Sequence, residues 1–518
     1  MFRLQTETGE LSFAQLGGEL AVGWATVDPA QWRAAAQALA RDGATLVSLW
    51  GSDRRDLGDG LVVMAAYSRG RQLLCLRLCM PASPYEFPSI SAEFPAANRM
   101  ERAVFDLLGA RALGDDERPW LRHGAWPADF FPLRRDADGA CSFEPFQDHY
   151  AFVPVTGDGV HEIPVGPVHA GIIEPGHFRF SVVGEKVLRL EERLGYVHKG
   201  IDKRFEGMPL DQAVRLAGRV SGDSTVAYAW AYSMAAESAT GAIVPARAAW
   251  LRALLLERER VGNHLGDLGA LGNDAALAAG LAQFSRLREL WLRCNEEVFG
   301  HRLLMDCIVP GGTRIDLDTS QFERLRRQCS EIAAEVMTLR TIYEEHPGLQ
   351  DRFVSTGVVT PELAARLGLR GLAGRASGQV RDLRVDCRCV PYDQLDVRIA
   401  SDGRGDVAAR VAVRFDELFE SLRLIDAIMQ RLPAGEVTCS LPAVAHDGAL
   451  GFGWVEGWRG DVMVALEVDP DGLLRRCHCH DPSWQNWPVL EHAVIGNIVP
   501  DFPLINKSFN LSYSGVDR

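Results

Sequence analysis

Paired cysteines are missing from this sequence. Its 518 residues include eleven cysteines, and no two of them form a C-x-x-C pair. The closest pairs are Cys75 and Cys79, Cys387 and Cys389, and Cys477 and Cys479. Because an odd number of cysteines without a signal-peptide pattern favours reduced thiols, the sequence argues against a disulfide framework.

Several other patterns are absent. No apolar run is long enough to span a bilayer, and the first residues, MFRLQTETGEL, lack the pattern of a signal peptide. We therefore expect a cytoplasmic chain that meets a membrane only through partners. The formal net charge of −14 argues against a nucleic-acid-binding surface. There is no Walker loop, G-x-G-x-x-G after a strand, H-E-x-x-H or G-x-S-x-G, so no nucleotide-binding or hydrolase motif is present.

The composition predicts a folded chain with more than one domain. A hydrophobic content of 47% and a charged content of 24% are typical of folded proteins. A chain of 518 residues is longer than one hydrophobic core usually accommodates. We predict an α+β fold in three parts. Residues 1–135 form a small α+β domain, residues 136–160 a linker rich in Gly, Pro and Asp, and residues 161–518 a large, mainly helical domain with small β units.

Residue patterns predict the elements of both domains. In the first, residues 31–41 read as a helix and residues 60–68 and 71–80 as two strands. A further helix is expected to be capped by Asn98. In the second, strand-like alternation is expected over residues 381–400, and a β region over residues 450–479. Amphipathic periodicity predicts a helix bundle, with helices over residues 185–204, 211–219, 226–237, 246–271, 281–304, 320–345 and 406–432.

Two short polar stretches stand out, and we call them the first and the second polar break. Residues 219–225 read R-V-S-G-D-S-T, and residues 512–518 read S-Y-S-G-V-D-R. Each has an S-x-x-S or S-x-x-G core where a metal enzyme of the same outline would carry C-x-x-C. Two C-x-x-C pairs at opposite ends of a long chain could converge into a four-thiolate site for a redox metal. Here all four positions are serine or glycine.

Candidates for catalysis are Glu174, His169, Arg219 and Arg375. Glu174 lies in one Gly/Pro-rich turn with His169 and His177, and a carboxylate between two imidazoles could relay protons near neutral pH. The alternative is that Glu174 pairs locally and the histidines are ordinary polar residues. Arg219, beside the first break, and Arg375, in R-A-S-G, could point into a cavity. Their alternative is a salt bridge between helices.

The run Cys477-His478-Cys479-His480 has the composition of a metal site. Period-2 alternation along a strand, however, would place both cysteines on one face and both histidines on the other, so the four side chains would not converge. Buried cysteine as a small apolar residue is the favoured reading here and at Cys387 and Cys389. His198 and His264 are both expected on helices, in packing roles.

Ordered motifs over nearly the whole chain resemble one known family. Residues 98–135, N-R-M-E-R-A-V-F-D-L-L-G to F-F-P-L-R-R, resemble the C subunit of bacterial complex I. From residue 161 the chain resembles the D subunit, and still more the large subunit of membrane-bound, energy-converting nickel–iron hydrogenases of the formate hydrogenlyase type. The motifs that carry this second resemblance are G-P-V-H-A-G-I-I-E-P-G-H-F-R-F (166–180), E-R-L-G-Y-V-H-K-G (192–200), R-A-S-G-Q-V-R-D-L-R (375–384), D-P-S-W-Q-N-W-P (481–488) and the stretch from I-V-P-D-F-P to V-D-R (498–518).

The resemblance implies a lost metal site. The hydrogenases carry R-V-C-G-I-C and a terminal C-Y-S-C-T-D-R, whose four thiolates hold nickel and iron. The matching positions here are Ser221, Ser224, Ser512 and Gly515, so the resemblance implies a chain that binds neither metal. Many such enzymes carry a C-terminal extension that is removed, and from the resemblance we expect none here after Arg518. Glu174 is expected near the vacated cavity, with a role in proton transfer.

The resemblance also implies partners and an electron path. The chain is expected to dock on a small iron–sulfur subunit that resembles the complex I B subunit, and with it on antiporter-like membrane subunits. It would be peripheral to the inner membrane, with no cofactor of its own. Electrons would come from the partner's iron–sulfur cluster. A quinone is a possible acceptor, although the family's quinone-contacting Tyr aligns near Leu210 and its paired His has its nearest match in His169. The alternative is a non-catalytic scaffold that couples conformational change to ion movement.

Overall fold

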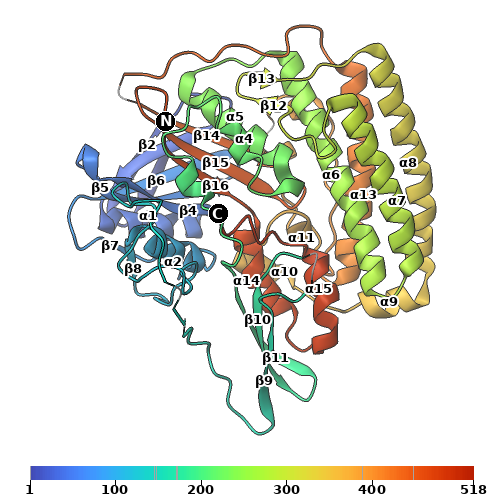
Figure 1. The fold of residues 1–518 in the computed structure, drawn as a ribbon, viewed down its shortest axis with the longest axis horizontal. Helices are drawn as coiled ribbons and strands as arrows, with labels where there is room; N and C mark the ends of the chain where they lie inside the picture. The colour runs from blue at the N-terminus through green and yellow to red at the C-terminus, as the bar shows by residue number, and fades with distance from the viewer. Residues whose placement is uncertain (1, 145, 148, 171–172, 388, 447) are drawn as a thin grey trace.

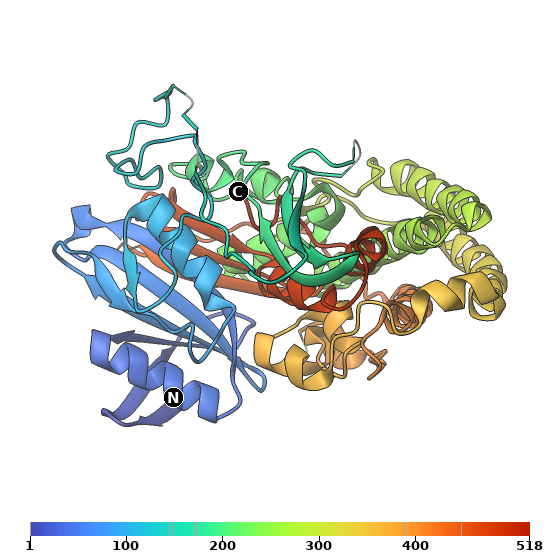
Figure 2. The same ribbon diagram turned by 90° about the horizontal axis from the view of Figure 1, so that it is seen from below.

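The computed structural model of the chain describes residues 2–144, 146–147, 149–170, 173–387, 389–446 and 448–518. Three parts follow one another across Figure 1: an N-terminal β domain, a central three-stranded sheet, and a bundle of long helices at the other end. The view from below in Figure 2 shows the central sheet between the other two parts. This α+β arrangement, with a small first domain and a larger helical second domain, confirms the predicted fold class.

The N-terminal domain is built on a six-stranded sheet with the order β1-β2-β3-β6-β5-β4. Its strands are β1 (Phe2–Thr6), β2 (Gly9–Gln15), β3 (Val22–Val27), β4 (Thr45–Arg54), β5 (Gly60–Arg69) and β6 (Gln72–Met80). Strand β3 pairs parallel with β6, and the other pairs are antiparallel. Helices α1 (Pro29–Arg41) and α2 (Ala97–Leu108) accompany the sheet, with the short strands β7 (Glu86–Pro88) and β8 (Arg111–Leu113) and the 3-10 turn η1 (Arg55–Leu57).

The predicted helix over residues 31–41 and the two predicted strands are confirmed as α1, β5 and β6. Helix α1 begins where Asp28 and Gln31 form a capping box. The prediction that Asn98 caps the next helix is wrong, because α2 begins one residue earlier and its N-cap, Ala96, makes no side-chain cap bond.

The second domain contains the long helices. They are α5 (Thr225–Thr240), α6 (Ala246–Asp274), α7 (Ala278–Phe299), α8 (Thr319–Glu345) and α13 (Val407–Arg431). Shorter helices are α3 (Ile201–Arg204), α4 (Val214–Ala217), α9 (Pro347–Phe353), α10 (Pro361–Leu367), α11 (Gly371–Arg375), α12 (Leu383–Asp386), α14 (Ser483–Ala493) and α15 (Phe502–Phe509), with the 3-10 turns η2 (Gly222–Ser224), η3 (Tyr392–Gln394) and η4 (Val499–Asp501). Helix α6 packs against α7 and α13, which confirms the predicted bundle.

Two element predictions for this domain are wrong. The stretch 185–204 is not one helix: it contains strand β11 (Lys186–Arg193), which pairs with β10 (His177–Val183), and only then the short helix α3. Apolar residues spaced by three and four fit a helix, but pairing with β10 decided the conformation. The described residues of 381–400 contain no strand. Instead Asp382 caps the short helix α12, because its side chain accepts a hydrogen bond from Arg384 N.

Small sheets complete the domain. Strands β9 (Val160–Val165), β10 and β11 form a three-stranded sheet that projects from the body in Figure 1. A two-stranded unit joins β12 (Ile308–Val309) and β13 (Gly312–Thr313). The central sheet consists of β14 (Ala449–Glu456), β15 (Asp461–Val468) and β16 (Leu474–His480). This last sheet confirms the β region predicted over residues 450–479.

Helix α5 lies directly on the central sheet because two residues of β14 are glycines. A Cβ atom at Gly453 would lie 1.8 Å from the carbonyl oxygen of Ala231, and one at Gly451 would lie 1.9 Å from that of Ala235. Only glycine therefore permits this approach of helix backbone to strand backbone. The contact fixes the start of α5, and with it the first polar break, relative to the sheet.

The two domains share a polar contact and a core. Strand β4 of the first domain faces β16 of the second: the Ser48 hydroxyl lies 2.8 Å from His478 Nε2, and the Trp50 ring stacks on the His478 ring at 4.8 Å. The largest cluster of buried apolar residues runs through both domains. Between β8 and β9 the described residues form no helix or strand. The boundaries at residues 135 and 160 stay a prediction.

Candidate functional site

The start of α5 meets one end of the central sheet. The turn between β14 and β15 carries Trp458 and Arg459, and the indole N–H of Trp458 donates to the Asp223 carbonyl over 2.9 Å. Residues 510–518, the C-terminal segment, contact the same turn: Arg459 Nε donates to the Asn510 carbonyl over 2.5 Å. Asp223 of the first polar break and Asn510, two residues before the second polar break, therefore both contact the turn that carries Trp458 and Arg459, although they lie far apart in the sequence.

The four positions that carry thiolates in the resembled motif belong to these two segments of the chain. Ser221 donates its hydroxyl to Asp223, and the Ser224 hydroxyl accepts from Arg459 Nη1 over 3.3 Å. In the C-terminal segment the Ser512 hydroxyl accepts the N–H of Gly515 over 2.9 Å. The four positions thus offer three hydroxyls and no sulfur atom. All three hydroxyls are already engaged by the protein itself.

Arg459 and Asp223 form a two-point ion pair at the centre of the site. Asp223 Oδ1 lies 3.0 Å from Arg459 Nη1, and Oδ2 lies 2.5 Å from Nη2. Burial by itself would raise the pKa of Asp223, but the charge of Arg459 and its hydrogen bonds lower that pKa to about 2. The Arg459 guanidinium also lies 4.0 Å from the centre of the Trp458 ring. The arginine is therefore fixed from several sides.

Asp481, directly after β16, fills the space beside Gly515. A Cβ atom at Gly515 would lie 2.6 Å from Asp481 Cγ and 2.7 Å from its Oδ2. The carboxylate is held by the Tyr228 hydroxyl of α5, which donates over 2.9 Å, and by Ser483 N over 2.8 Å. Asp481 thus occupies the volume that any side chain at residue 515 would need.

A buried carboxyl group supports the start of α5. Glu259, on α6, accepts hydrogen bonds from Val226 N at 2.6 Å and Ala227 N at 3.2 Å. Burial raises its pKa to about 8, although these backbone donors lower it. With Asp223 and Asn263 it lines a pocket of about 20 Å³, room for about one water molecule. Glu259 can hold a proton at neutral pH beside the first break.

Glu174 also reaches the C-terminal segment. It accepts from Ser514 N over 3.1 Å and from the Ser514 hydroxyl. His169 packs instead against the rings of Phe178 and Tyr513, and His177 Nδ1 lies 3.4 Å from the Gly166 carbonyl. No hydrogen bond between Glu174 and either imidazole is found among the described residues. Among the described residues, Glu174 alone of the three forms a hydrogen bond to residues 512–515, whereas His169 reaches them only through its ring contact with Tyr513.

The two predicted arginines lie in other surroundings. Arg219 is half-exposed and paired with Asp306 at 2.7 and 2.8 Å. Arg375 is fully buried on α11 and pairs with Glu417 and Glu456, both at 2.7 Å. Arg375 on α11 thus forms a salt bridge between helices with Glu417 on α13, as its alternative predicted, whereas Arg219 and Asp306 pair outside helices. Whether either acts in catalysis stays a prediction.

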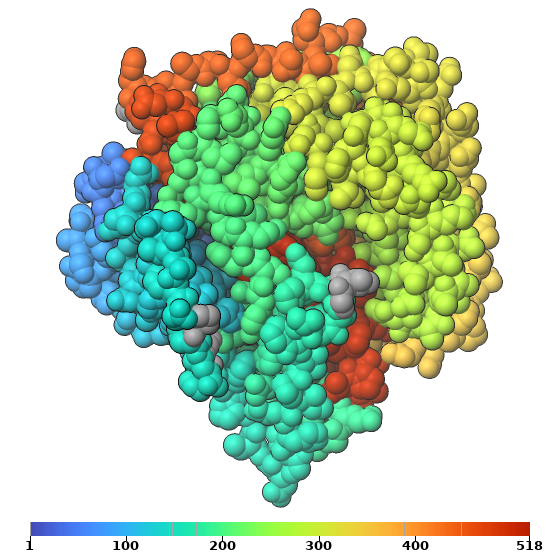
Figure 3. Space-filling model, viewed as in Figure 1, coloured from blue at the N-terminus to red at the C-terminus, as the bar shows by residue number. Residues whose placement is uncertain are grey.

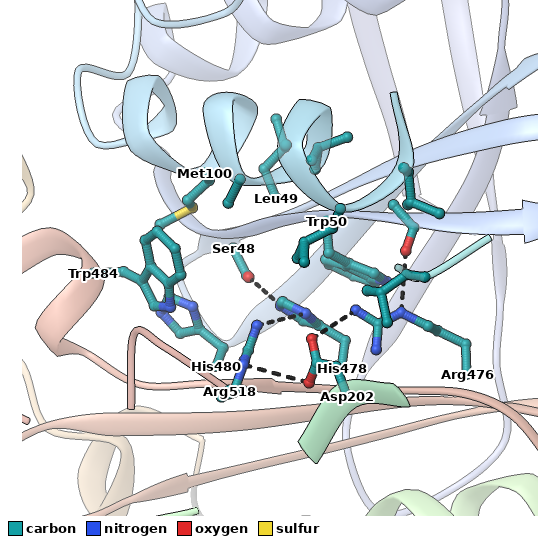
Figure 4. A pocket seen from close by; sticks show the side chains of 16 residues that line it. Ser48, Leu49, Trp50, Met100, Asp202, Arg476, His478, His480, Trp484 and Arg518 are labelled. Atoms are coloured by element: carbon teal, nitrogen blue, oxygen red, sulfur yellow. Dashed lines mark hydrogen bonds and ion pairs between the residues drawn. The ribbon is translucent and has the colours of Figure 1, made fainter. Parts of the chain in front are cut away.

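The Cys-His-Cys-His run lies on β16, with the alternation expected of a strand. Cys477 and Cys479 place their sulfur atoms 3.8 Å apart. His478 and His480 line a separate pocket between the domains, with Trp50 and Arg518 (Figure 4). Burial lowers the pKa of His478 well below its usual range. Within the described part of the chain, no group of three or more His, Cys, Asp or Glu side chains could hold a metal ion.

The two other histidines differ from each other. His264 lies on α6, as expected, with its Nε2 3.0 Å from Glu417 Oε2. His198 is not helical: it lies between β11 and α3, and its Nδ1 is 2.8 Å from Asp517 Oδ1. This second contact anchors the C-terminal segment beside the site.

Sequence reasoning missed the residues that organise the site. Arg459 and Asp481 lie more than 230 residues beyond the first break, in a turn and at a strand end. One signal was available: Asp223 stands where the resembled R-V-C-G-I-C motif has isoleucine. A charged residue in place of an apolar one, in a half-buried turn, favours a partner of opposite charge.

Comparison with known proteins agrees with this architecture. Two family models match: "Respiratory-chain NADH dehydrogenase, 30 Kd subunit" over residues 25–141 and "Respiratory-chain NADH dehydrogenase, 49 Kd subunit" over residues 274–449. Formate hydrogenlyase subunit 5 of Escherichia coli (strain K12) is 34% identical over 488 residues, 92% of this chain and 85% of that protein. Hydrogenase-4 component G of the same organism is 33% identical over 479 residues, 91% of this chain and 83% of that protein.

A solved structure shares the fold. It is a chain from "the membrane-bound sulfane sulfur reductase (MBS), an archaeal respiratory membrane complex", with a TM-score of 0.66 and 25% sequence identity, and the match covers 71% of this chain and 100% of that one. The chain therefore belongs to the family of hydrogenase-related large subunits in which a complex I 30 kDa-type domain is fused to a 49 kDa-type domain. This confirms the family resemblance. In the described residues no helix is both long and apolar enough to cross a bilayer.

Proposed function

We propose that this chain is the large subunit of a hydrogenase-related, complex I-like membrane redox complex that works without a nickel–iron centre. One observation carries the proposal: the four ligand positions hold three serines and a glycine, closed over by the Asp223–Arg459 pair and by Asp481. Hydroxyl groups are poor ligands for a low-valent metal that thiolates favour. The fixed guanidinium of Arg459 would also repel a metal cation placed beside it.

Electrons are proposed to arrive from a partner iron–sulfur subunit and to leave to a small acceptor. Similarity to subunits of formate hydrogenlyase and of a membrane-bound respiratory complex supports a place in such an assembly, peripheral to the membrane through partner subunits. The acceptor is not fixed by the family: one relative by fold belongs to a sulfane sulfur reductase. A quinone and a sulfane sulfur compound are both candidates.

Glu174 is proposed to move protons at the edge of this site. Its carboxylate contacts Ser514, between the third and fourth ligand positions. Its side chain is exposed, so it can exchange protons with solvent. Glu259, with a raised pKa on the other side of the first break, is a second proton store.

A second candidate function is that of a non-catalytic scaffold, which couples conformational change to ion movement in the membrane subunits. The observation that favours it is the closed state of the site. The pocket that reaches Gly222 and Asp223 has a volume of about 20 Å³, which admits about one water and no quinone ring.

The test is elemental analysis of the complex purified through a tag on this chain. We expect iron from the partner subunit and less than stoichiometric nickel. Nickel near one atom per chain would contradict the proposal.

If nickel is absent, reduction of a quinone or of polysulfide by the chemically reduced complex supports the redox function. Loss of that activity in Glu174→Gln assigns Glu174 as the proton donor. Reduction of neither acceptor favours the scaffold.

A further inference from the structure

Four arginines line a large cleft on the surface. It has a volume of about 700 Å³ and lies between the α3–α4 segment and the residue that follows β13. Its positive side chains are Arg204, Arg215, Arg219 and Arg314, and Asp211 is the one acidic residue among its lining. The α3–α4 segment belongs to the green part of the chain, which forms the middle of the face in Figure 3.

Most of this positive charge is not neutralised by the chain. Arg219 is paired with Asp306, whereas no ion pair of Arg204, Arg215 or Arg314 is found among the described residues. The positive charge acts on a neighbouring carboxyl group: the hydrogen bond from Arg219 lowers the pKa of Asp306, and the charges of Arg215 and Arg314 lower it further. Unpaired arginines gathered in one concavity are unusual in a chain with a net charge of −14.

The chemistry of the lining selects the ligand. Guanidinium groups bind carboxylates through two parallel hydrogen bonds, which gives geometric specificity as well as charge. Met208 and Leu216 add apolar surface to the same cleft. A segment that alternates carboxylates with apolar side chains would satisfy both kinds of surface.

A membrane surface fits less well. An anionic bilayer is broad and flat, and within a Debye length of about 8 Å it would repel a chain of this net negative charge. A short acidic segment enters the cleft and meets only its arginines.

We propose that the cleft lined by Arg204, Arg215, Arg219 and Arg314 is the docking site for an acidic segment of a partner protein. The proposal is independent of the metal content of the complex. It also explains why charges are left unpaired here: the partner supplies the carboxylates. The bound segment would lie next to Arg219, two residues before Ser221, and so would bring the partner close to the first polar break.

The test measures binding of a labelled peptide to the full chain by fluorescence anisotropy. The probe is a peptide of about eight residues in which glutamate and leucine alternate, and its control has glutamine in place of glutamate. We expect the acidic peptide to bind and the control not to bind. Binding should weaken roughly tenfold between low salt and about 0.5 M salt, because the charges become screened.

Two charge-reversed variants test whether the peptide binds in the cleft. R215E/R314E, with reversed charge in the cleft, should weaken binding of the acidic peptide by roughly tenfold or more. R286E/R293E makes the same change of charge on the exposed surface of α7 and should leave binding unchanged. Circular dichroism confirms that both variants fold.

Three results would overturn the proposal. The first is absence of binding by the acidic peptide. The second is binding that R215E/R314E and R286E/R293E weaken equally, since net charge alone would then explain it. The third is a lipid preference: binding to phosphatidylglycerol vesicles, but not to phosphatidylcholine vesicles or to the peptide, that is lost in R215E/R314E.

Discussion

Asp223 and Arg459 face each other through both carboxylate oxygens and both terminal guanidinium nitrogens, at 3.0 and 2.5 Å. The pair links the turn before α5 to the turn between β14 and β15, and through Asn510 it reaches the C-terminal segment. One arginine therefore links three chain segments: the ion pair joins two of them, and a hydrogen bond to the Asn510 carbonyl adds the third.

Removing one member of this pair should destabilise the protein. Asp223→Asn leaves Arg459 buried without a counter-charge, and we expect a loss of about 2 kcal/mol. The loss is smaller than for a fully buried pair because the Asp223 side chain is 32% exposed. Urea unfolding measures it. The control is Glu331→Gln, which breaks an exposed contact with Arg327 and should cost well under about 1 kcal/mol. Equal effects of the two changes would contradict a structural role for the pair.

Glu259 should make stability fall as pH rises. Its pKa is raised from an ordinary value of 4.5 to about 8, so the folded state binds a proton that the unfolded state releases over this range. The stabilisation is fully present below about pH 4.5 and is lost as pH rises through about 8. Urea midpoints measured across that window should decline, and Glu259→Gln should flatten the decline. A decline of the same slope in Glu259→Gln would assign it to other groups.

Gly515 should not tolerate even a methyl group. In Gly515→Ala the added Cβ would lie 2.6 Å from Asp481 Cγ, and because Tyr228 and Ser483 hold Asp481, the clash should cost roughly 1–3 kcal/mol. The matched control is Gly139→Ala, where nothing lies within 4 Å of the added atom. A thermal melt of each variant provides the comparison. Unchanged stability of Gly515→Ala would mean that the Asp481 side chain can move aside.

Arg375 and Arg219 should differ sharply when truncated. Arg375→Met leaves Glu417 and Glu456 buried without their shared cation, and we expect a loss of about 3–5 kcal/mol. Arg219→Met breaks a half-exposed pair with Asp306 and should cost no more than about 1 kcal/mol. Chemical unfolding of both variants tests this. A stable Arg375→Met variant that has lost acceptor reduction would instead support the predicted catalytic role of Arg375.

The sequence predicted most of the long elements because their periodicity extends over many residues. Residues 246–271 and 320–345 became α6 and α8 with ends within a few residues of those expected. It failed where a short stretch suits two conformations, as at residues 185–204, and pairing with a distant strand decides between them. Resemblance predicted the four ligand positions, but it gave no sign of Arg459 beside Ser224 or of Asp481 beside Gly515.

The glycines of β14 have a consequence for how the site is made. Helix α5 rests on Gly451 and Gly453, which follow it by more than two hundred residues. During synthesis the first polar break therefore leaves the ribosome long before its supporting strand exists. Contacts of such sequence separation form slowly, since a long loop must close first. Until then the nascent chain exposes a markedly apolar helix to solvent. We therefore expect the nascent chain to depend on chaperones from the emergence of α5 until β14 has emerged.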